Sequence, residues 1–316
     1  MDMPLLNMNH EPGPRRFAVL LAAHNGTSHI LAQIESILQQ SGVDVQLFVS
    51  VDKSTDGTED LLLELAQSER RITLLPFGER FGAAAPNFYR LLRAVDLADF
   101  DFLSFADQDD IWHPAKLLRA ERLLAEQHAS GYSSNFNAFW PDGRVRPINK
   151  AYPQRAWDFL FESAGPGCTY VLEKVLAVQL QHVVRGAGAS LLTIDYHDWL
   201  AYAFARWHGF RWVIDTRSGL DYRQHAHNQL GANVGWRSFV FRVNRILRGY
   251  GFQQSRAIAD VVGAGHVPIV TQGLQRGRLG YLWLSVRAAH CRRKRIDQLW
   301  FFVSCVLCSV LRPAAS

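Results

Sequence analysis

The sequence predicts an α/β protein with a mostly parallel sheet flanked by helices, plus a basic helical segment toward the C-terminus. Strand-like apolar runs alternate with helix-like periodic segments through the first half of the chain, which is typical of parallel βαβ units. Hydrophobic residues make up 48% and charged residues 20% of the 316 residues, as in ordinary folded proteins. From Ala232 onward, 13 Lys and Arg residues accompany only Asp260 and Asp297, a net charge of +11.

The elements of the first half follow from local patterns. Strands are expected where apolar and β-branched residues run together, at 17–23, 45–51, 72–76 and 100–105. Helices are expected after them, at 28–40, 56–69, 87–97 and 114–127. Ile30 and Ile34 fall on one face of the first helix. Asp56 and Glu59 have the spacing of a capping box at the start of the second, and Pro114 suits the first turn of the fourth.

The second half gives coarser expectations. They are a strand at 168–172, helices at 173–184 and 196–209, and a strand with a loop over 211–225. The chain then divides into an N-terminal tail (1–16), an α/β domain (17–231) and a basic, apolar-ended helical segment (232–316). Four scattered cysteines do not make a disulfide scaffold, and the first residues lack a signal-peptide pattern. A cytosolic protein with reduced thiols is therefore expected.

Polar side chains follow three of the expected strands. Asn25 comes after the first strand, Asp52 after the second, and the acidic run 107–110 after the fourth. The carboxyl ends of parallel strands meet at one edge of a sheet, where doubly wound folds bind their ligands. We therefore expect these side chains to form one site.

The acidic run fits a metal-diphosphate site. Asp107 and Asp109 form a D-x-D pattern, and hard cations such as Mg²⁺ or Mn²⁺ take carboxylate and phosphate oxygens as ligands. A bound cation would offset the repulsion between the carboxylates. The alternative is a solvated loop whose acids favour the start of the helix at Pro114. An EF-hand is excluded, because the Gly and Glu of that loop are missing.

Asp52 is a candidate acceptor for a nucleobase N–H or a ribose hydroxyl. Asn25 offers polar groups at the end of the first strand, although the same residues also fit an ordinary turn into a helix. Asp56 is expected only to cap the following helix.

Three stretches carry a family resemblance: LLAAHNGTSHILAQIESIL, SVDKSTDGT and FADQDDIWHPAKL. In this order and spacing they resemble the inverting family 2 glycosyltransferases with the GT-A (nucleotide-diphospho-sugar transferase) fold. GPGCTYVL, DYHDWLAYAFARWHG and LDYRQHAHNQLGA resemble the rhamnosyltransferase-like bacterial branch. The resemblance covers about residues 17–232.

The resemblance implies roles for the edge residues. Asn25 and Asp52 would contact the nucleotide, Asp107 and Asp109 the metal and diphosphate, and Asp198 would be the catalytic base. One position departs from the family: Asp-Asp-Gly-Ser after the second strand is here Val51-Asp52-Lys53-Ser54. This departure weakens the nucleobase assignment more than the metal assignment.

The chemistry of the reaction and the local sequence also favour Asp198 as the catalytic base. Inverting transfer needs a carboxylate to take the proton of the acceptor hydroxyl, and a helix start favours an ionised carboxylate. The alternative is a stabilising Asp in a first helical turn.

The segment YRQHAHN and the stretch around residue 168 add further candidates. Arg223 suits bidentate contact with diphosphate oxygens. The family pattern favours His225 as a third metal ligand, and Cys168 and Thr169 are expected on the acceptor side.

The basic segment suggests an anionic partner. Four consecutive basic residues precede the apolar run 299–311, which as a helix spans about 20 Å and is too short for a bilayer. We expect an interfacial helix on an anionic membrane. Nucleic-acid binding is the rival, without a recognisable module, and a buried C-terminal helix is the third reading. Cys305 and Cys308 have the spacing of zinc ligands, but the sequence has no second pair of ligands near them. We therefore expect two buried or membrane-facing small side chains rather than a zinc site.

The sequence and the resemblance together predict a metal-dependent inverting glycosyltransferase. It would move a sugar, L-rhamnose from dTDP-L-rhamnose, to a lipid-linked or cell-surface glycan at the cytoplasmic face of the bacterial inner membrane. The rivals are a sugar-nucleotide nucleotidyltransferase, which would need a Gly-rich phosphate loop that AAHNGTSH lacks, and a non-catalytic membrane scaffold.

Overall fold

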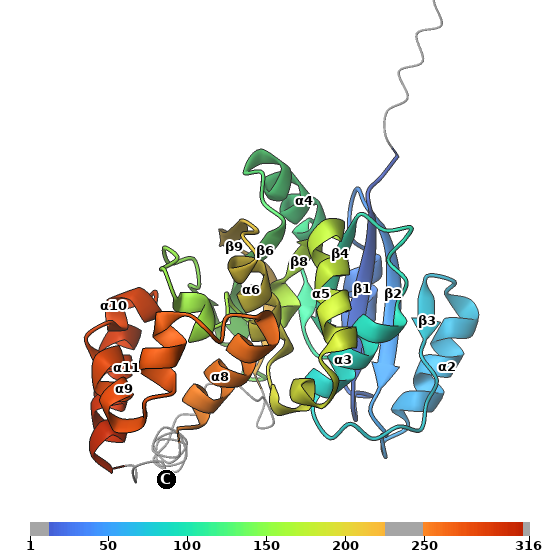
Figure 1. Cartoon of the computed structure of the whole chain (residues 1–316). Coiled ribbons are helices and arrows are strands. Elements are labelled where there is room, and N and C mark those ends of the chain that lie inside the picture. The colour runs from blue at the N-terminus through green and yellow to red at the C-terminus, as the bar shows by residue number, and fades with distance from the viewer. Residues whose placement is uncertain (1–12, 225–248, 312–316) are drawn as a thin grey trace, which may run out of the picture.

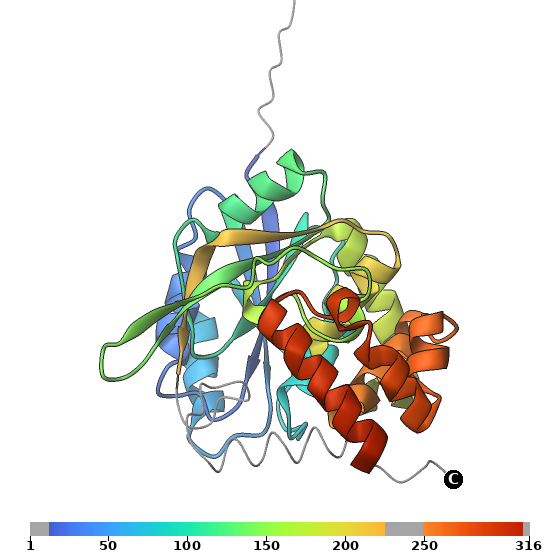
Figure 2. The ribbon, with the colours of Figure 1, turned by 90° about the vertical axis from the view of Figure 1, so that its left-hand side faces the viewer.

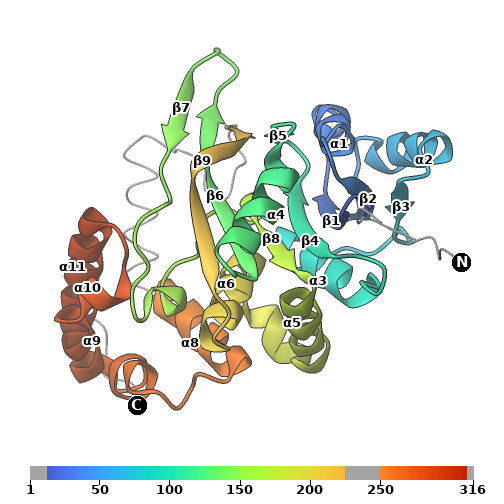
Figure 3. The same cartoon turned by 90° about the horizontal axis from the view of Figure 1, so that it is seen from above.

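The computed structural model describes residues 13–224 and 249–311. Within them a nine-stranded sheet runs through the α/β domain (Figure 1). Its strand order is β3-β2-β1-β4-β8-β6-β9-β5, with β7 paired to β6 (Figure 3). Helices cover both faces, with α1 and α4 on one side and α3, α5 and α6 on the other (Figure 3). The predicted α/β fold is thus confirmed.

The first half of the sheet is parallel, as expected. Its strands are β1 (Arg16–Ala23), β2 (Asp44–Val51), β3 (Ile72–Leu74) and β4 (Phe102–Asp107). The helices between them are α1 (Ile30–Leu38), α2 (Thr58–Ser68) and α3 (Ala84–Ala94). In register, Ala22 lies opposite Asp107 and Ala23 opposite Val51. The polar residues that follow these strands therefore share one edge.

The second half makes the sheet mixed. Its strands are β5 (Ile111–Trp112), β6 (Gly131–Phe139), β7 (Val145–Ile148), β8 (Val171–Glu173) and β9 (Trp212–Arg223). Strand β8 is antiparallel to both β4 and β6, whereas β6 and β9 are parallel. The helices are α4 (Lys116–Glu126), α5 (Lys174–Gly186) and α6 (His197–Trp207).

Two local expectations were wrong. The capping box does not form between Asp56 and Glu59: the Asp56 carboxylate accepts from the Thr58 N–H, whereas Glu59 accepts from the N–H of Ser54. The residue at the N-cap is instead Gly57, with φ of 87°. The expected strand at 168–172 begins later, because a 3₁₀ turn over Gly167–Thr169 comes before β8.

The C-terminal segment forms helices α8 (Tyr250–Val262), α9 (Gly277–Ser285), α10 (Ala288–Cys291) and α11 (Arg295–Leu311). A short π-helical turn, Ile269–Leu274, joins α8 to α9. These helices gather at one side of the sheet domain, shown in orange to red in Figure 2. α8 packs on α6, and α11 packs on α9. Their apolar residues belong to the same core as α3, α5 and α6.

A buried ion pair fastens the C-terminal segment to the α/β domain. The side chain of Arg293 is 4% exposed, and its Nε lies 3.6 Å from Asp158 and 3.5 Å from Glu162. Arg292 pairs with Glu162 and Asp297. Two of the four consecutive basic residues are therefore held by acids of the protein. Only Lys294 and Arg295 of that run are exposed.

Helix α11 has one buried face. Phe301, Cys305 and Cys308 point into the core. Cys305 and Cys308 form no metal cluster with other described residues. Apolar side chains remain exposed on α9 and α11: Leu279, Leu282, Ile296, Leu299, Trp300, Phe302, Leu307, Val310 and Leu311. Among the described residues, no helix combines the length and apolar character that crossing a bilayer requires.

Candidate active site

A cavity of about 470 Å³ lies at the carboxyl edge of the sheet. Four of the predicted site residues line it, from the ends of two strands and from one helix: Asp52, Asp107, Asp109 and Asp198. Asp107 is the last residue of β4 and Asp109 lies in the turn that follows. Asp52 follows β2, and Asp198 lies in the first turn of α6. Residues separated by up to about half the chain thus meet in one hollow.

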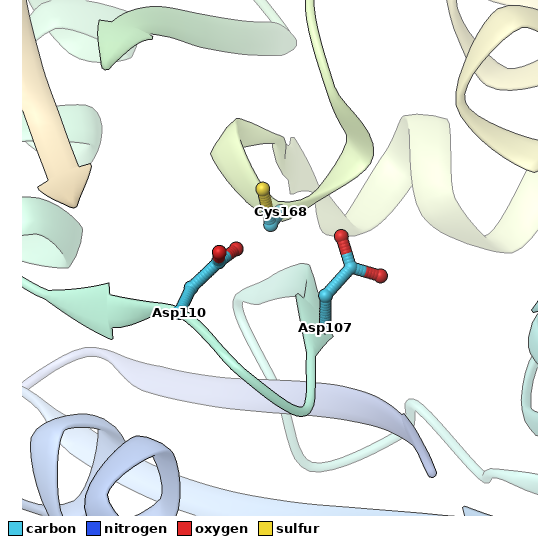
Figure 4. A group of neighbouring side chains, drawn as sticks. All are labelled: Asp107, Asp110 and Cys168. Carbon is cyan, nitrogen blue, oxygen red and sulfur yellow. The ribbon is translucent and has the colours of Figure 1, made fainter. Parts of the chain in front are cut away.

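The acidic turn packs against Cys168. The ligand atoms of Asp107, Asp110 and Cys168 all lie within 4.8 Å of one another, and they form the one group among the described residues that could hold a metal ion (Figure 4). The alternative of a solvated acidic loop does not hold for Asp110. It is fully buried, because the returning strand β9 covers it and the Arg223 N–H donates to its Oδ1 at 3.3 Å.

Charge crowding in this cluster is severe. Burial, then the Asp109 and Asp198 charges, raise the pKa of Asp107 to about 7. The pKa of Asp110 is also raised well above its ordinary value, by burial first and then by the charges of Asp107 and Asp109. Burial raises the pKa of the Cys168 thiol too, so it stays protonated and is a poor ligand for a hard cation.

The donor set fits a divalent cation that prefers oxygen. Asp110 Oδ2 is buried and forms no hydrogen bond with the described part of the chain. Such an atom is costly unless a cation or a proton satisfies it. The carboxylates of the turn are oxygen ligands of the kind that Mg²⁺ and Mn²⁺ take.

Gln108, between the two acids, fastens the turn to the end of β1. Its Oε1 accepts from the His24 N–H at 2.8 Å, and its Nε2 donates to the His24 carbonyl at 2.8 Å. Gln33 of α1 donates to the Asp107 carbonyl at 2.9 Å. These bonds fix the backbone from which the carboxylates project.

Asp52 and Asn25 hold loops of the protein together. Both Asp52 carboxylate oxygens accept backbone N–H groups, from Phe81 at 2.8 Å and from Gly82 at 2.7 Å. Asn25 has a left-handed backbone (φ 47°), and its Oδ1 accepts from the Thr55 N–H at 2.8 Å. Asp52 lines the cavity, whereas Asn25 is not among its lining residues.

Asp198 has the surroundings of a general base. It is 7% exposed, and the Trp199 N–H donates to its Oδ1 at 2.7 Å. Burial raises its pKa to about 6, against the lowering effects of this N–H and of Lys150. The carboxylate is therefore ionised at neutral pH yet basic enough to take a proton in a transition state.

Three further predicted residues, Arg223, Cys168 and Thr169, do not line the cavity. Arg223 donates from Nε to the Asp109 carbonyl at 2.9 Å, so it supports the acidic turn. Cys168 and Thr169 are buried behind Pro166 and Gly167, which do line the cavity. His225 lies outside the described residues.

Several lining residues escaped the sequence analysis. His197 stacks on Phe88 with ring centroids 3.8 Å apart, and its Nε2 is buried without a partner among the described residues. Burial lowers the pKa of His197 to about 3, so the ring is neutral. Asn87 Oδ1 is likewise unpaired there, and exposed Arg80 brings a positive charge to the rim. Only contacts made by the fold identify these residues.

Comparisons with known proteins show the family of the chain. Residues 18–170 match the model of glycosyl transferase family 2. The chain is 35% identical over 288 residues to the dTDP-rhamnosyl transferase RfbG of Shigella flexneri, covering 91% of this chain and 99% of that protein. It is 29% identical over 161 residues to WfgD of Escherichia coli, a UDP-Glc:α-D-GlcNAc-diphosphoundecaprenol β-1,3-glucosyltransferase. That match covers 50% of this chain and 60% of WfgD.

Solved structures share the fold at lower identity. S. aureus TarS 1-349, in complex with UDP-GlcNAc, superposes with a TM-score of 0.52 at 12% identity, over 92% of this chain and 89% of that one.

Proposed function

The chain belongs to glycosyl transferase family 2, and we propose that this glycosyltransferase moves L-rhamnose from dTDP-L-rhamnose onto a glycan in polysaccharide biosynthesis. The observation that carries this proposal is the near-complete match to a dTDP-rhamnosyl transferase, 35% identical over 99% of its length. The cavity supplies what such a transfer needs, because a buried carboxylate and an acidic turn face the same space.

The proposed reaction is a single displacement with inversion. Asp198 accepts the proton of the acceptor hydroxyl as its oxygen bonds to the anomeric carbon of the sugar. The bond from that carbon to the diphosphate oxygen breaks, and the electron pair leaves with dTDP. The base and the departing diphosphate must then lie on opposite sides of the sugar, and Asp198 and the acidic turn come from different elements.

The remaining residues of the site would bind the donor. Asn25 and Asp52 would lie at the nucleoside, and Asp107 and Arg223 at the diphosphate. Asp109, with His225 from outside the described residues, would hold Mg²⁺ or Mn²⁺. When bound, such a cation neutralises charge on a departing diphosphate.

The acceptor is proposed to be lipid-linked or a cell-surface glycan. Its sugar would enter from the side of Pro166 and Gly167, in front of Cys168 and Thr169. WfgD, a relative, acts on a sugar carried by diphosphoundecaprenol. The exposed apolar face of α9 and α11, with Lys294 and Arg295 beside it, would bring the protein to the cytoplasmic face of an anionic membrane.

Product stereochemistry tests the proposal. The purified protein is incubated with dTDP-L-rhamnose, Mn²⁺ and a lipid-linked acceptor, and the new linkage is examined by NMR. The anomeric configuration is expected to be opposite to that of the donor. Retention would refute the single displacement, and transfer from other nucleotide sugars but not from dTDP-L-rhamnose would refute the donor assignment. If the protein catalyses neither sugar transfer nor hydrolysis of the donor, the result favours a non-catalytic scaffold instead.

A further inference from the structure

Four consecutive residues, 195–198, line one wall of the catalytic cavity where the chain enters α6. Asp198 is the proposed base, whereas the displacement uses neither Asp195 nor Tyr196. Asp195 is exposed and Tyr196 is partly buried, so both side chains are accessible to a ligand in the cavity. We call Asp195 and Tyr196 the α6 wall.

Helix α8 of the C-terminal segment lies beside α6 and fixes the backbone of this wall (Figure 1). Gln254 of α8 accepts from the Asp195 N–H through Oε1 at 2.9 Å and donates through Nε2 to the Thr193 carbonyl at 2.9 Å. Gln254 is buried, so water competes little for these bonds. From α3, the Tyr89 hydroxyl donates to the Ile194 carbonyl at 3.2 Å. The segment that leads into α6 is thus held by two helices.

The same helix α8 orients the Asp195 carboxylate. The Tyr250 hydroxyl donates to its Oδ2. The other oxygen, Oδ1, accepts no hydrogen bond from the described residues. The rings of Tyr250 and Tyr196 meet edge-on with centroids 6.4 Å apart. Tyr250 therefore supports both side chains of the α6 wall and leaves one carboxylate oxygen for a ligand.

The charge of the α6 wall selects the kind of group that can bind there. Asp195 and Asp198 line the same wall, so electrostatic repulsion disfavours a diphosphate beside them. A sugar hydroxyl, by contrast, donates to a carboxylate, and such charge-assisted hydrogen bonds are among the stronger ones. The ring of Tyr196 adds an apolar surface for the face of a sugar ring. The wall therefore suits an uncharged ring with several hydroxyls.

The turn past which the acceptor is proposed to enter lies against the start of α6. A Cβ atom added to Gly167 would lie 2.5 Å from His197 Nε2 and 3.3 Å from Asp198 Cβ. His197 Nε2 is buried and has no hydrogen-bond partner in the described part of the chain. A sugar that enters past Gly167 therefore meets the residues at the start of α6 first.

We propose that Asp195 and Tyr196 bind the sugar of the acceptor. Asp195 Oδ1 accepts from a hydroxyl other than the one that attacks, and the Tyr196 ring lies against the sugar face. Tyr250 is a positioning residue that acts through Asp195. This inference rests on the proposed function, because it assigns the acceptor sugar to residues of the same cavity. It also gives the C-terminal segment a part in the choice of acceptor.

Acceptor kinetics test the role of Asp195. The probes are octyl glycosides of glucose, galactose, N-acetylglucosamine and rhamnose, and the one with the highest kcat/KM is the reference acceptor. Asp195→Ala should raise the KM of the reference acceptor about 10–100-fold, as for a lost hydrogen bond to a charged group, and leave the affinity for dTDP-L-rhamnose unchanged. Asp60→Ala removes an exposed carboxylate of α2 and is the matched control, which should keep the wild-type KM.

Monodeoxy analogues of the reference acceptor identify the contact. Removal of the hydroxyl that Asp195 binds should raise KM about tenfold or more for wild type, and should raise it no further for Asp195→Ala. A folded Asp195→Ala protein with the wild-type KM for the reference acceptor would overturn the proposal. So would an Asp195→Ala protein that is as sensitive as wild type to the loss of every hydroxyl.

A double-mutant cycle tests whether Tyr250 acts through Asp195. Tyr250→Phe keeps the ring and removes the donor, so acceptor KM should rise about threefold or more with donor affinity unchanged. Added to Asp195→Ala, the same change should have no effect on KM. Tyr152→Phe, at a partly buried tyrosine that does not line the cavity, is the control. Equal effects of Tyr250→Phe with and without the Asp195 carboxylate would refute the positioning role.

Wild-type assays separate this inference from the proposed function. Absence of transfer from dTDP-L-rhamnose to every glycoside and to the lipid-linked acceptor would count against the proposed function. The α6 wall is then tested by saturation-transfer NMR with the same glycosides, in the presence of dTDP and Mg²⁺. Weaker binding to Asp195→Ala than to wild type and Asp60→Ala would support it, and equal binding, or none to wild type, would overturn it. Normal wild-type transfer with an unchanged KM in Asp195→Ala would count against the α6 wall alone.

Discussion

Burial gives the Asp198 carboxylate a pKa of about 6, close to the pH at which a general base works best. Asp198→Asn keeps the shape and removes the basicity, so we expect kcat to fall by about 10²–10⁴-fold with little change in donor affinity. Donor titration and initial rates measure the two effects. Asp60→Asn, on the surface of α2, is the control and should keep wild-type rates. Equal rates for Asp198→Asn and wild type would exclude Asp198 as the base.

The pH dependence of the rate follows from the same residue. The active form of Asp198 is ionised, and its raised pKa means that protons compete for it up to about pH 6. We expect kcat/KM to be level near pH 7–8 and to fall about tenfold per pH unit below 6. This acidic decline is measured as the pH profile of kcat/KM at saturating metal. A rate independent of pH between 5 and 8 would contradict the assignment.

The crowded acids also predict a stability effect. The folded-state pKa of Asp107, about 7, lies above its ordinary value of 3.8, so its contribution to stability is lost as the pH rises from 3.8 to 7. At pH 8 without metal, Asp107→Asn should therefore raise Tm by about 2–4 °C, roughly 1 kcal/mol for a domain of this size. Mn²⁺ should raise the Tm of wild type but less so that of Asp107→Asn. A Tm for metal-free Asp107→Asn below that of metal-free wild type would show that the charge of Asp107 does not destabilise the folded protein.

The sequence predicted which residues meet in the site better than it predicted how deeply each one is buried. Asp52, Asp107 and Asp109 were expected at one edge because parallel strands end together, and the structure places them in one cavity with Asp198. Their chemical roles stay predictions. The burial of Asp110 depends on β9, more than a hundred positions along the chain, and no local pattern encodes it.

At the scale of elements, local patterns sufficed where a strand is apolar. Strands β1, β2 and β4 begin and end within about two residues of their expected limits. Strand β6 was not predicted, since buried Ser133 and Ser134 break the apolar pattern. The Ser133 hydroxyl is satisfied by the indole N–H of Trp212 on β9, at 3.0 Å. Such a strand can be found only together with its partner.

Helix α11 and its neighbour α9 carry the proposed membrane surface. Replacing Phe302 and Val310 by Ser removes two exposed apolar side chains of α11. We expect this double variant to bind anionic vesicles at least tenfold more weakly, since a buried side chain of this kind contributes about 1.5–3 kcal/mol. Co-sedimentation measures the binding. Leu31→Ser with Leu63→Ser, on α1 and α2, is the control and should bind as wild type. If the α11 variant binds anionic vesicles as tightly as wild type, the exposed face of α9 and α11 is not the membrane-binding surface.

At the scale of the whole molecule, the ion pair of Arg293 decides whether the C-terminal helices stay docked. Arg293→Met leaves buried Asp158 and Glu162 without this cation, and we expect a loss of about 3–5 kcal/mol of stability. Urea denaturation measures it. Arg144→Met breaks an exposed pair with Asp142, which water screens, and should change the stability far less than Arg293→Met. Similar losses for both variants would mean that burial adds nothing to the Arg293 pair.

The same ion pair has a consequence for synthesis on the ribosome. Asp158 emerges on the order of ten seconds before Arg293, at about 5–20 residues per second. During that interval the nascent chain carries Asp158 without the Arg293 cation that pairs with it in the folded protein. We expect such a chain to be a client of chaperones, and the final docking of α11 to be the step that releases it.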